Sequence, residues 1–251
     1  MSGFSARQEA LKQEFIARRG FWDSSWEGML GLDPDFFEAY LAFAAVPWST
    51  GPLEPKVKEF ISIAVDASTT HLHVPGLRQH IAQAMELGAT RAEIMEVLEL
   101  TSVLGIHSCV EGVPILIEEL ATAGQPVGTE LDDDRRALKE RFIAVRGYWN
   151  PFWDGLLVLD PAFFEAYLRF SSVPWQTGSL APKIKELIYV AIDAATTHLY
   201  LPGLRQHIRN ALKYGATREE IMEVFELASV IGIHSCTTGV PILLQQEEKP
   251  A

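Results

Sequence analysis

The chain has 251 residues, of which 48% are hydrophobic, and it carries a formal net charge of −12 at pH 7. This acidity offers no basic field for phosphates, so neither nucleic acid nor an anionic membrane surface is expected as a partner. The polar N-terminus lacks an apolar signal segment, the run 60–65 ends at Asp66 far short of a membrane span, and only two cysteines occur, so we expect a soluble cytoplasmic protein.

Helical signals begin in the first fifty residues. Asp33 stands before Pro34 and predicts a capped helix through FFEAYLAF. Pro55 opens another helix, and residues 57–68 are apolar on most sides of it. A helix that is apolar all round is normally buried, so this one is expected at the centre of the core.

Prolines and a capping box mark the elements that follow. Pro75 opens a helix, and Thr90 with Glu93 forms a capping box for the next one, which is expected to end near Gly105. Pro114 is expected to begin the last helix of this half. No stretch of useful length alternates as a strand does, so we predict an all-α fold.

The second half of the chain repeats the first at an offset of 127 residues. EFISIAVDASTTHLHVPGLRQHI (59–81) matches ELIYVAIDAATTHLYLPGLRQHI (186–208) without a gap at about two-thirds of positions. A segment with three structure-breaking residues and an Asp run separates the halves. We therefore predict two tandem helical modules related by pseudo-two-fold symmetry: module 1 at 1–123, a linker at 124–134, and module 2 at 135–251.

A carboxylate and a histidine on neighbouring helices form the main candidate site. Glu59 lies on the apolar helix and His80 lies beside the buried stripe of the next helix, and they recur as Glu186 and His207. A buried carboxylate next to an imidazole fixes the tautomer and raises the imidazole pKa, which suits a general acid or base.

Further histidines extend the candidate set. His71 lies in a predicted turn and His107 follows a glycine where a helix ends, and both places are typical of pocket walls. We expect the glutamate and these histidines to share one cavity in each module. The candidate catalytic residues are Glu59, His71, His80 and His107 in module 1, and Glu186, His198, His207 and His234 in module 2.

A metal site is an alternative use of the same residues. His71, His73 and His80 are spaced like a metal cluster, but Tyr200 replaces His73 in module 2, which argues against one. A site built from Glu59, His71, His80 and His107 stays open as the alternative. We expect no metal and no cofactor.

The remaining ionisable residues have simpler interpretations. Asp66 shares a helix face with Glu59 and is expected to form a salt bridge with Lys56, Lys58 or Arg78. Cys109 and Cys236 are lone thiols, which are expected to be buried and inert unless a nearby cation lowers the thiol pKa.

An ordered set of motifs resembles the carboxymuconolactone decarboxylase superfamily, which includes alkylhydroperoxidase D. The set comprises DP-x-FFEAY, K-x-K-E at the start of an apolar helix, L-R-Q-H and GATR-x-EIMEV, and it covers most of each module. The resemblance implies an all-α fold that assembles as trimers, or as hexamers of paired modules. Three two-module chains would then form a homotrimer with six modules.

The peroxidase branch of this superfamily is matched only in part. It uses a Glu, a C-x-x-C pair and a following His, and Glu59 and His80 match the Glu and the His. HLHVPG and HLYLPG stand where the cysteine pair would be. A dithiol cycle needs an attacking and a resolving thiol, so peroxidase activity would have to rely on Cys109 or Cys236 alone.

The decarboxylase branch resembles the chain better at L-R-x-H and implies a lyase that releases CO₂ without a cofactor. In this reading His80 or His71 donates a proton and Glu59 orients it. The expected substrate is a small-molecule carboxylate. The residues expected to hold it are Lys58 and Arg78 in module 1, and Lys185 and Arg205 in module 2.

Three other functions stay open: a peroxidase that uses the lone thiols, a metal-dependent enzyme, and a non-catalytic binding protein. The replacement of His73 by Tyr200 shows that the two modules have diverged at an expected pocket position. Both sites could therefore be active with different preferences, or one could be degenerate.

Overall fold

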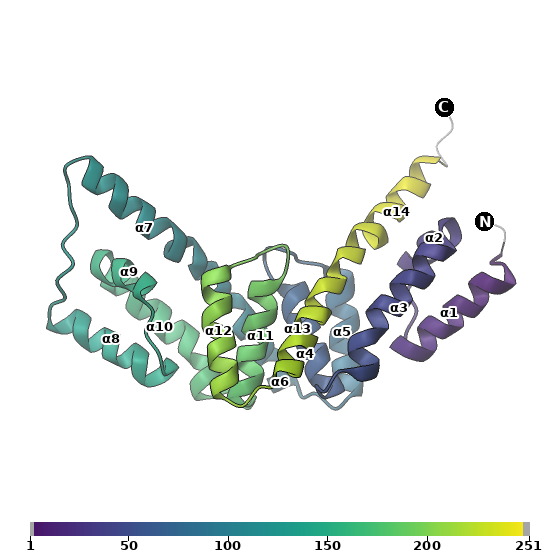
Figure 1. The fold of residues 1–251 in the computed structure, drawn as a ribbon, viewed down its shortest axis with the longest axis horizontal. Coiled ribbons are helices and arrows are strands. Elements are labelled where there is room, and N and C mark those ends of the chain that lie inside the picture. The colour runs from purple at the N-terminus through teal and green to yellow at the C-terminus, as the bar shows by residue number, and fades with distance from the viewer. Residues whose placement is uncertain (1–2, 248–251) are drawn as a thin grey trace.

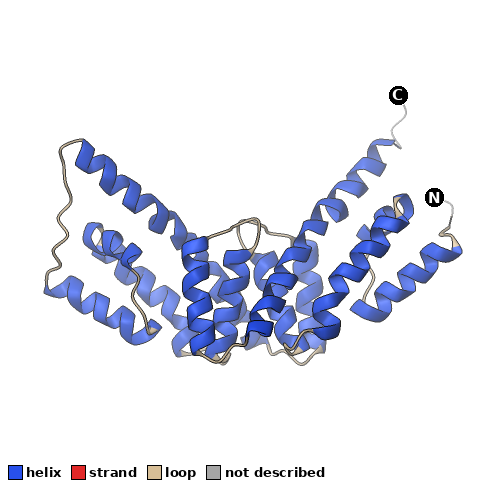
Figure 2. Ribbon diagram, viewed as in Figure 1, coloured by secondary structure: helices blue, strands red, loops and turns tan. Residues whose placement is uncertain are grey.

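The computed structural model describes residues 3–247, and within that range the chain forms fourteen α-helices, three short 3-10 turns and no β-strand (Figure 2). The predicted all-α fold of two tandem modules is confirmed.

The helices of the first half are α1 (Ala6–Arg19), α2 (Ser25–Leu32), α3 (Pro34–Thr50), α4 (Pro55–Ala67), α5 (Val74–Glu86), α6 (Arg91–Ser102), the 3-10 turn η1 (Val103–Ile106) and α7 (His107–Thr122). Those of the second half are α8 (Asp133–Arg146), the 3-10 turn η2 (Pro151–Trp153), α9 (Asp154–Leu159), α10 (Pro161–Gln176), α11 (Pro182–Ala194), α12 (Leu201–Lys213), α13 (Arg218–Ser229), the 3-10 turn η3 (Val230–Ile233) and α14 (His234–Glu247).

Most predicted helix starts agree with the structure. Asp33 caps α3 by accepting a hydrogen bond from the Phe36 amide at 2.9 Å. Thr90 and Glu93 form the expected capping box at the start of α6. These caps satisfy backbone N–H groups that a helix start leaves without a partner.

The predicted start of the last helix at Pro114 is wrong. The helix α7 begins at His107, and Pro114 lies inside it. Proline removes one backbone hydrogen bond from a helix interior. The preceding turn is anchored by buried Ile106 and Val110, and η1 joins α6 directly to α7, so the chain stays helical before the proline.

The molecule consists of a central bundle and two wings (Figure 1). The bundle contains α4, α5, α6, α11, α12 and α13. One wing joins α1, α2 and α3 to α14, and the other joins α8, α9 and α10 to α7. Each wing therefore combines the front helices of one module with the last helix of the other.

Buried side chains show the same exchange of last helices. Val110 of α7 belongs to a core cluster with Phe142 and Phe164 of module 2. Ile233, at the start of α14, belongs to a cluster with Phe15 of module 1. The linker between α7 and α8 thus separates two repeats in the sequence but not two independent cores.

The helices α4 and α11 lie at the centre of the bundle, as their apolar sequences predicted. Ile61 and Val65 of α4 pack in one cluster with Leu187 and Val190 of α11, and all four are completely buried. Burying such a side chain contributes about 1.5–3 kcal/mol, so the two modules stabilise each other through a shared core.

Two buried ion pairs connect the modules. Lys58 Nζ lies 2.7 Å from Glu223 Oε1, and Lys185 Nζ lies 2.9 Å from Glu96 Oε1. Lys58 also donates to the Pro47 carbonyl at 2.6 Å. These lysines therefore brace the junction between modules, which contradicts their expected role in holding substrate.

Two helical stretches are long and apolar enough, by length and composition alone, to cross a membrane: Arg91–Thr122 and Arg218–Gln246. Core helices of globular proteins pass the same test. Each stretch contains a buried glutamate of the ion pairs, Glu96 or Glu223, in its first half. Such a charge is costly in the hydrocarbon of a bilayer.

Candidate functional site

In each half of the molecule a pocket lies at a junction between modules. Pocket 1 has a volume of about 100 Å³ and is lined by helices α1 to α5 of module 1 together with α13, η3 and α14 of module 2. Pocket 2 has a volume of about 30 Å³ and is lined mainly by module 2, with η1 and α7 of module 1. The exchanged last helices complete both pockets.

The expected contact between Glu59 and His80 is present. Glu59 lies one turn into α4 and is 4% exposed, and its Oε2 lies 2.6 Å from His80 Nδ1. A carboxylate accepts, so the imidazole donates through Nδ1, and His80 Nε2 is left to face Asp66 Oδ2 at 3.9 Å. His80 lines pocket 1, and Glu59 contacts it from the interior.

Module 2 contains the equivalent pair with one addition. His207 Nδ1 lies 2.6 Å from Glu186 Oε2, and the side-chain amide of Asn210 donates to Glu186 Oε1 at 3.1 Å. Both modules therefore hold a buried carboxylate that fixes the orientation of an imidazole. The catalytic role of these residues stays a prediction.

The other histidines pair across the two modules. His71 Nε2 lies 2.8 Å from His234 Nδ1, and His107 Nδ1 lies 2.7 Å from His198 Nε2. The expectation that His107 shares a cavity with Glu59 is wrong, because α7 carries His107 to pocket 2. For the same reason His234 completes pocket 1 rather than the pocket of its own module.

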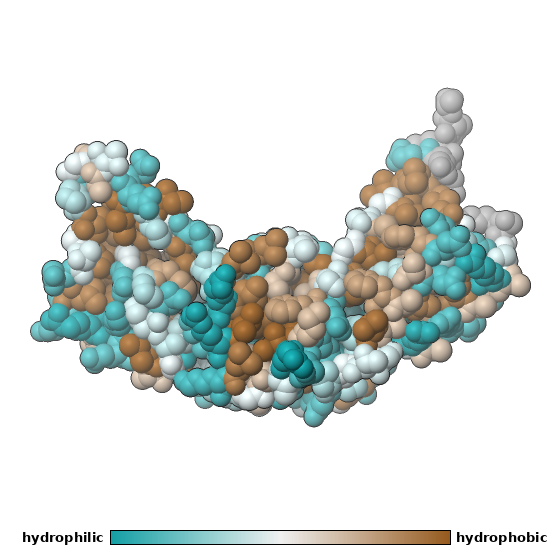
Figure 3. Space-filling view, in the orientation of Figure 1, coloured by the Kyte–Doolittle hydropathy of each residue, from teal (hydrophilic) through white to brown (hydrophobic). Residues whose placement is uncertain are grey.

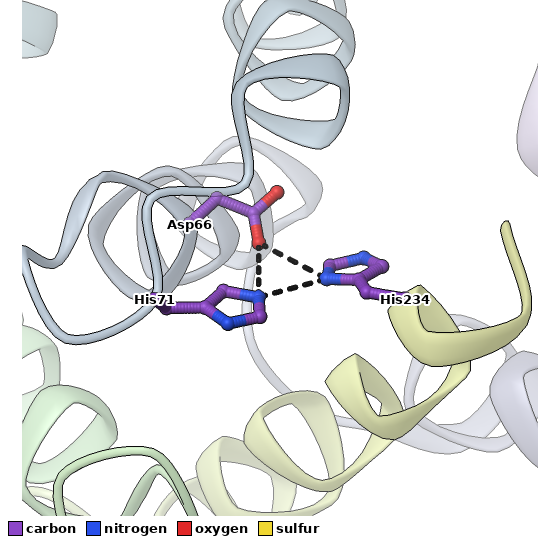
Figure 4. A group of neighbouring side chains, drawn as sticks. All are labelled: Asp66, His71 and His234. Carbon is purple, nitrogen blue, oxygen red and sulfur yellow. Dashed lines mark hydrogen bonds and ion pairs between the residues drawn. The ribbon is translucent and has the colours of Figure 1, made fainter. Parts of the chain in front are cut away.

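Asp66 lies at the centre of the group around His71. Its Oδ1 lies 3.6 Å from His71 Nε2 and 3.8 Å from His234 Nδ1, so the three side chains face one another (Figure 4). Asp66 is 1% exposed, and its Oδ2 is a buried oxygen without a hydrogen-bond partner among the described residues. Asp193 has the same position and the same partnerless Oδ2 in pocket 2.

The predicted salt bridge of Asp66 with a lysine or arginine is not formed. Lys56 pairs with Glu93 at 2.9 Å, and Lys58 pairs with Glu223. Histidines surround Asp66 instead. Burial lowers the pKa of His234 to about 3, although the charge of Asp66 acts in the opposite direction.

One arginine lies in each pocket, and the sequence analysis missed both. The Arg19 guanidinium lies 4.4 Å from the centre of the Trp48 ring, and that of Arg146 lies 4.8 Å from the Trp175 ring. Burial lowers the pKa of Arg19, but an arginine keeps its charge at neutral pH. The sequence feature that could have identified these arginines is the R-G-aromatic-W motif, which is repeated near the start of both modules.

The residues expected to hold a carboxylate do not reach the pockets. Arg78 and Arg205 are exposed and line neither pocket 1 nor pocket 2. Lys58 and Lys185 are occupied by their ion pairs. In L-R-Q-H the arginine is two residues before the histidine, and residues two apart on a helix do not share a face, so the arginine points away from the pocket that the histidine lines.

Pocket 2 is narrower because tyrosines replace smaller residues of pocket 1. Tyr189 stands at the position of Ser62, and its ring stacks on His207 with the centres 4.5 Å apart. Tyr200 stands at the position of His73 and stacks on the ring of His107 at 3.8 Å. The volume left is about 30 Å³, against about 100 Å³ in pocket 1.

The two cysteines lie outside both pockets. Cys109 and Cys236 are free, half-buried thiols, and neither lines pocket 1 or pocket 2. Cys109 lies instead in a surface hollow between η1, α7 and α10. The thiols are therefore not part of the wall beside the Glu–His pairs.

Comparison with known proteins points to one family. The carboxymuconolactone decarboxylase family matches residues 34–105 and 161–233. A solved structure from Burkholderia xenovorans LB400, described as a "putative gamma-carboxymuconolactone decarboxylase subunit", is 50% identical and superposes with a TM-score of 0.94. The match covers 96% of this chain and 97% of that one. A search of curated proteins found no match.

Proposed function

Because the chain belongs to the carboxymuconolactone decarboxylase family, we propose that it is a lyase that removes CO₂ from a small carboxylated substrate in pocket 1. Family membership supports a decarboxylase-like activity in general. The particular chemistry, the site and the roles of residues are the proposal, and they rest on the geometry of pocket 1.

One observation carries the proposal. His80, fixed by a 2.6 Å hydrogen bond to buried Glu59, opens onto a cavity of about 100 Å³ that also contains the cation Arg19. Pocket 1 is smaller than the apolar cavity of roughly 150 Å³ that holds benzene, so the substrate would be a small molecule. A proton donor and an anion-binding group therefore face the same small molecule.

The proposed step needs one proton and no organic cofactor. Arg19 holds a carboxylate or carbonyl oxygen of the substrate. As the carbon–carbon bond to the departing CO₂ breaks, its electron pair remains on the substrate as a carbanion conjugated with a carbonyl group. His80 then delivers its Nε2 proton to that carbanion, and solvent restores the proton.

Glu59 and Tyr40 have supporting roles in this scheme. Glu59 accepts from His80 Nδ1 and stabilises the imidazolium before it donates. Burial raises the pKa of Tyr40 to about 12, so its phenol stays protonated at neutral pH and can donate to a developing enolate. Arg19 and Tyr40, both of module 1, would thus supply hydrogen-bond donors on the side of the pocket where the enolate oxygen develops.

The experiment compares His80→Ala with its matched control, His207→Ala. Carboxylated lactones would be screened with the full chain, and CO₂ release would be measured together with solvent deuterium in the product. Removing a general acid typically costs 10²–10⁴-fold, and we expect this loss for His80→Ala but less than twofold for His207→Ala. Turnover that survives in His80→Ala would refute the proposal.

We also propose that three chains assemble into a homotrimer and that the protein is cytoplasmic. Large apolar side chains are exposed at equivalent positions of the two modules. They are Phe36, Phe43, Ile115 and Leu116 in module 1, and Phe163, Phe170, Ile242 and Leu243 in module 2. Figure 3 shows apolar surface on both wings. Burying such faces between chains would account for two long apolar helices without a membrane.

A further inference from the structure

We infer that Asp66, His71 and His234 form a binding site for a divalent transition-metal ion at the edge of pocket 1. This inference goes beyond the proposed lyase activity and does not depend on it. It also departs from the expectation of a metal-free protein drawn from the sequence.

The three ligand atoms have the spacing of a coordination site. The distances between them are 2.8 Å for the two histidine nitrogens, and 3.6 and 3.8 Å from Asp66 Oδ1 to each. A point about 2.0 Å from all three atoms lies in their plane, and this distance equals the usual length of a bond from zinc to imidazole nitrogen or carboxylate oxygen. The two nitrogens share a hydrogen bond in this structure, so a bound ion would replace the shared proton and move them slightly apart. In Figure 4 all three side chains point at this place.

The buried charge of Asp66 is otherwise poorly satisfied. Its Oδ2 has no hydrogen-bond partner among residues 3–247, because His73 Nδ1 and His80 Nε2, the ring nitrogens that face it, lie 3.8 and 3.9 Å away. Burying a polar group without a partner is unfavourable, and buried charges in proteins are usually paired or coordinate a metal. A cation bound to Oδ1 would balance the negative charge of this buried carboxylate.

The backbone around these ligands is conformationally constrained. Leu72, which directly follows His71, has φ of 47° in the left-handed region that a leucine rarely adopts, and Leu199 repeats this with φ of 49°. A Cβ added to Gly76 would lie 2.1 Å from Asp66 Oδ2. The turn and the start of α5 therefore hold His71 and Asp66 in fixed positions.

The same set recurs in pocket 2. His107, Asp193 and His198 bring their ligand atoms within 4.8 Å of one another, and Asp193 Oδ2 is also buried without a partner in the described chain. The replacement of His73 by Tyr200 argued against a metal cluster in the sequence, but His73 is not a member of this set. We therefore expect two ions per chain.

The donor set indicates the class of ion. Two imidazole nitrogens and one carboxylate oxygen suit Zn²⁺, Fe²⁺ or Mn²⁺ better than Ca²⁺ or Mg²⁺, which prefer oxygen ligands. Asp66 and His234 also line pocket 1, so the coordination positions that these three residues leave open face the cavity. An ion there could bind an anionic oxygen of a small molecule.

The test measures metal binding by the full chain without any assay of turnover. Protein stripped with a chelator would be titrated with Co²⁺, and binding would be measured from the visible absorption of the cobalt complex. A second sample would be reloaded with Zn²⁺ and its metal content measured by elemental analysis. We expect about two ions per chain for the unaltered protein, about one for His234→Ala, and about one for His198→Ala. Asp66→Asn gives a second measurement at pocket 1, with circular dichroism to show that each variant is folded.

The matched control is His73→Tyr, which copies the residue that module 2 already has at this position. It should leave both ions bound, because His73 lies beside the proposed ligands without belonging to them. The inference would be overturned if the unaltered chain bound none of Zn²⁺, Fe²⁺ and Mn²⁺ in stoichiometric amount. It would also be overturned if folded His234→Ala still bound two ions per chain. Neither result bears on decarboxylation, which His80→Ala tests separately.

Discussion

Replacing Lys58 with methionine should destabilise the protein strongly, because it removes one partner of a buried ion pair between the modules. Lys58 is 3% exposed and Glu223 is 2% exposed, and their charged atoms lie 2.7 Å apart. Removing one member of such a pair leaves a buried charge uncompensated and costs about 3–5 kcal/mol. Glu223 keeps the amide of Leu53, which donates to its Oε2 at 2.7 Å, but loses its cation.

The assay is chemical and thermal unfolding at a fixed protein concentration, followed by circular dichroism. For a chain of this size about 1 kcal/mol corresponds to about 2–4 °C, so Lys58→Met should lower the Tm by about 6–20 °C. Lys56→Met is the matched control, two residues away. Lys56 pairs with Glu93 at 2.9 Å, but its side chain is 29% exposed, and such a pair contributes at most about 1 kcal/mol.

A second variant separates the lost ion pair from lost packing. In the double variant Lys58→Met with Glu223→Gln, the amide oxygen can still accept from Leu53, and no buried charge remains. Most of the stability should return. If Lys58→Met were no less stable than Lys56→Met, or if the double variant were as unstable as the single one, the reasoning about the buried charge would be refuted.

Three further predictions concern the pockets, the thiols and the assembly. Tyr189→Ser, which copies Ser62, should enlarge pocket 2 toward the volume of pocket 1 and allow it to bind the same small molecules, seen as a second binding event in calorimetry; an unchanged stoichiometry would contradict this. The double variant Cys109→Ser, Cys236→Ser should keep its turnover within about twofold, because neither thiol lines a pocket, and a complete loss of activity with peroxide would favour the peroxidase alternative instead. Phe43→Lys with Phe170→Lys should convert trimers to single chains in light scattering, since both rings are about half exposed on the wings; an unaltered mass would show that these faces do not join chains.

The sequence was sufficient to predict the helices and the Glu–His pairs because both depend on local patterns. Glu59 and His80 lie on consecutive helices that pack against each other, so their contact follows from helix positions alone. The repeat supplied the same prediction twice. Caps such as Asp33 also act on the next few residues and can be recognised directly.

The exchange of last helices could not be predicted in the same way. His71 and His234 are 163 residues apart, and His107 carries the same flanking motif as His234. Because the two modules have the same motifs, local patterns fit an exchanged and an unexchanged arrangement equally well. Only the direction in which η1 and η3 carry the chain decides between them, and that depends on packing across the whole bundle.

The partners of Asp66 were predicted wrongly, and Arg19 was missed, for a related reason. Asp66 has lysines near it in the sequence, but those lysines find partners on α6 and α13, which the sequence does not place. Arg19 comes from a helix of the wing, far from the central motifs along the chain. The identity of a partner is set by tertiary packing, and proximity in the sequence is a poor substitute for it.

The exchanged helices α7 and α14 give each half of the polypeptide a share in both pockets. A substitution in α14 would thus change the wall of pocket 1, most of which belongs to module 1, and leave the wall of pocket 2 unchanged. If the chain were cut at the linker, an intact first half from one chain and an intact second half from another would together complete pocket 1. Because both copies lie in one chain, the two pockets can also carry different residues, as they do at Ser62 and Tyr189, which the pockets of a symmetric pair of identical subunits cannot.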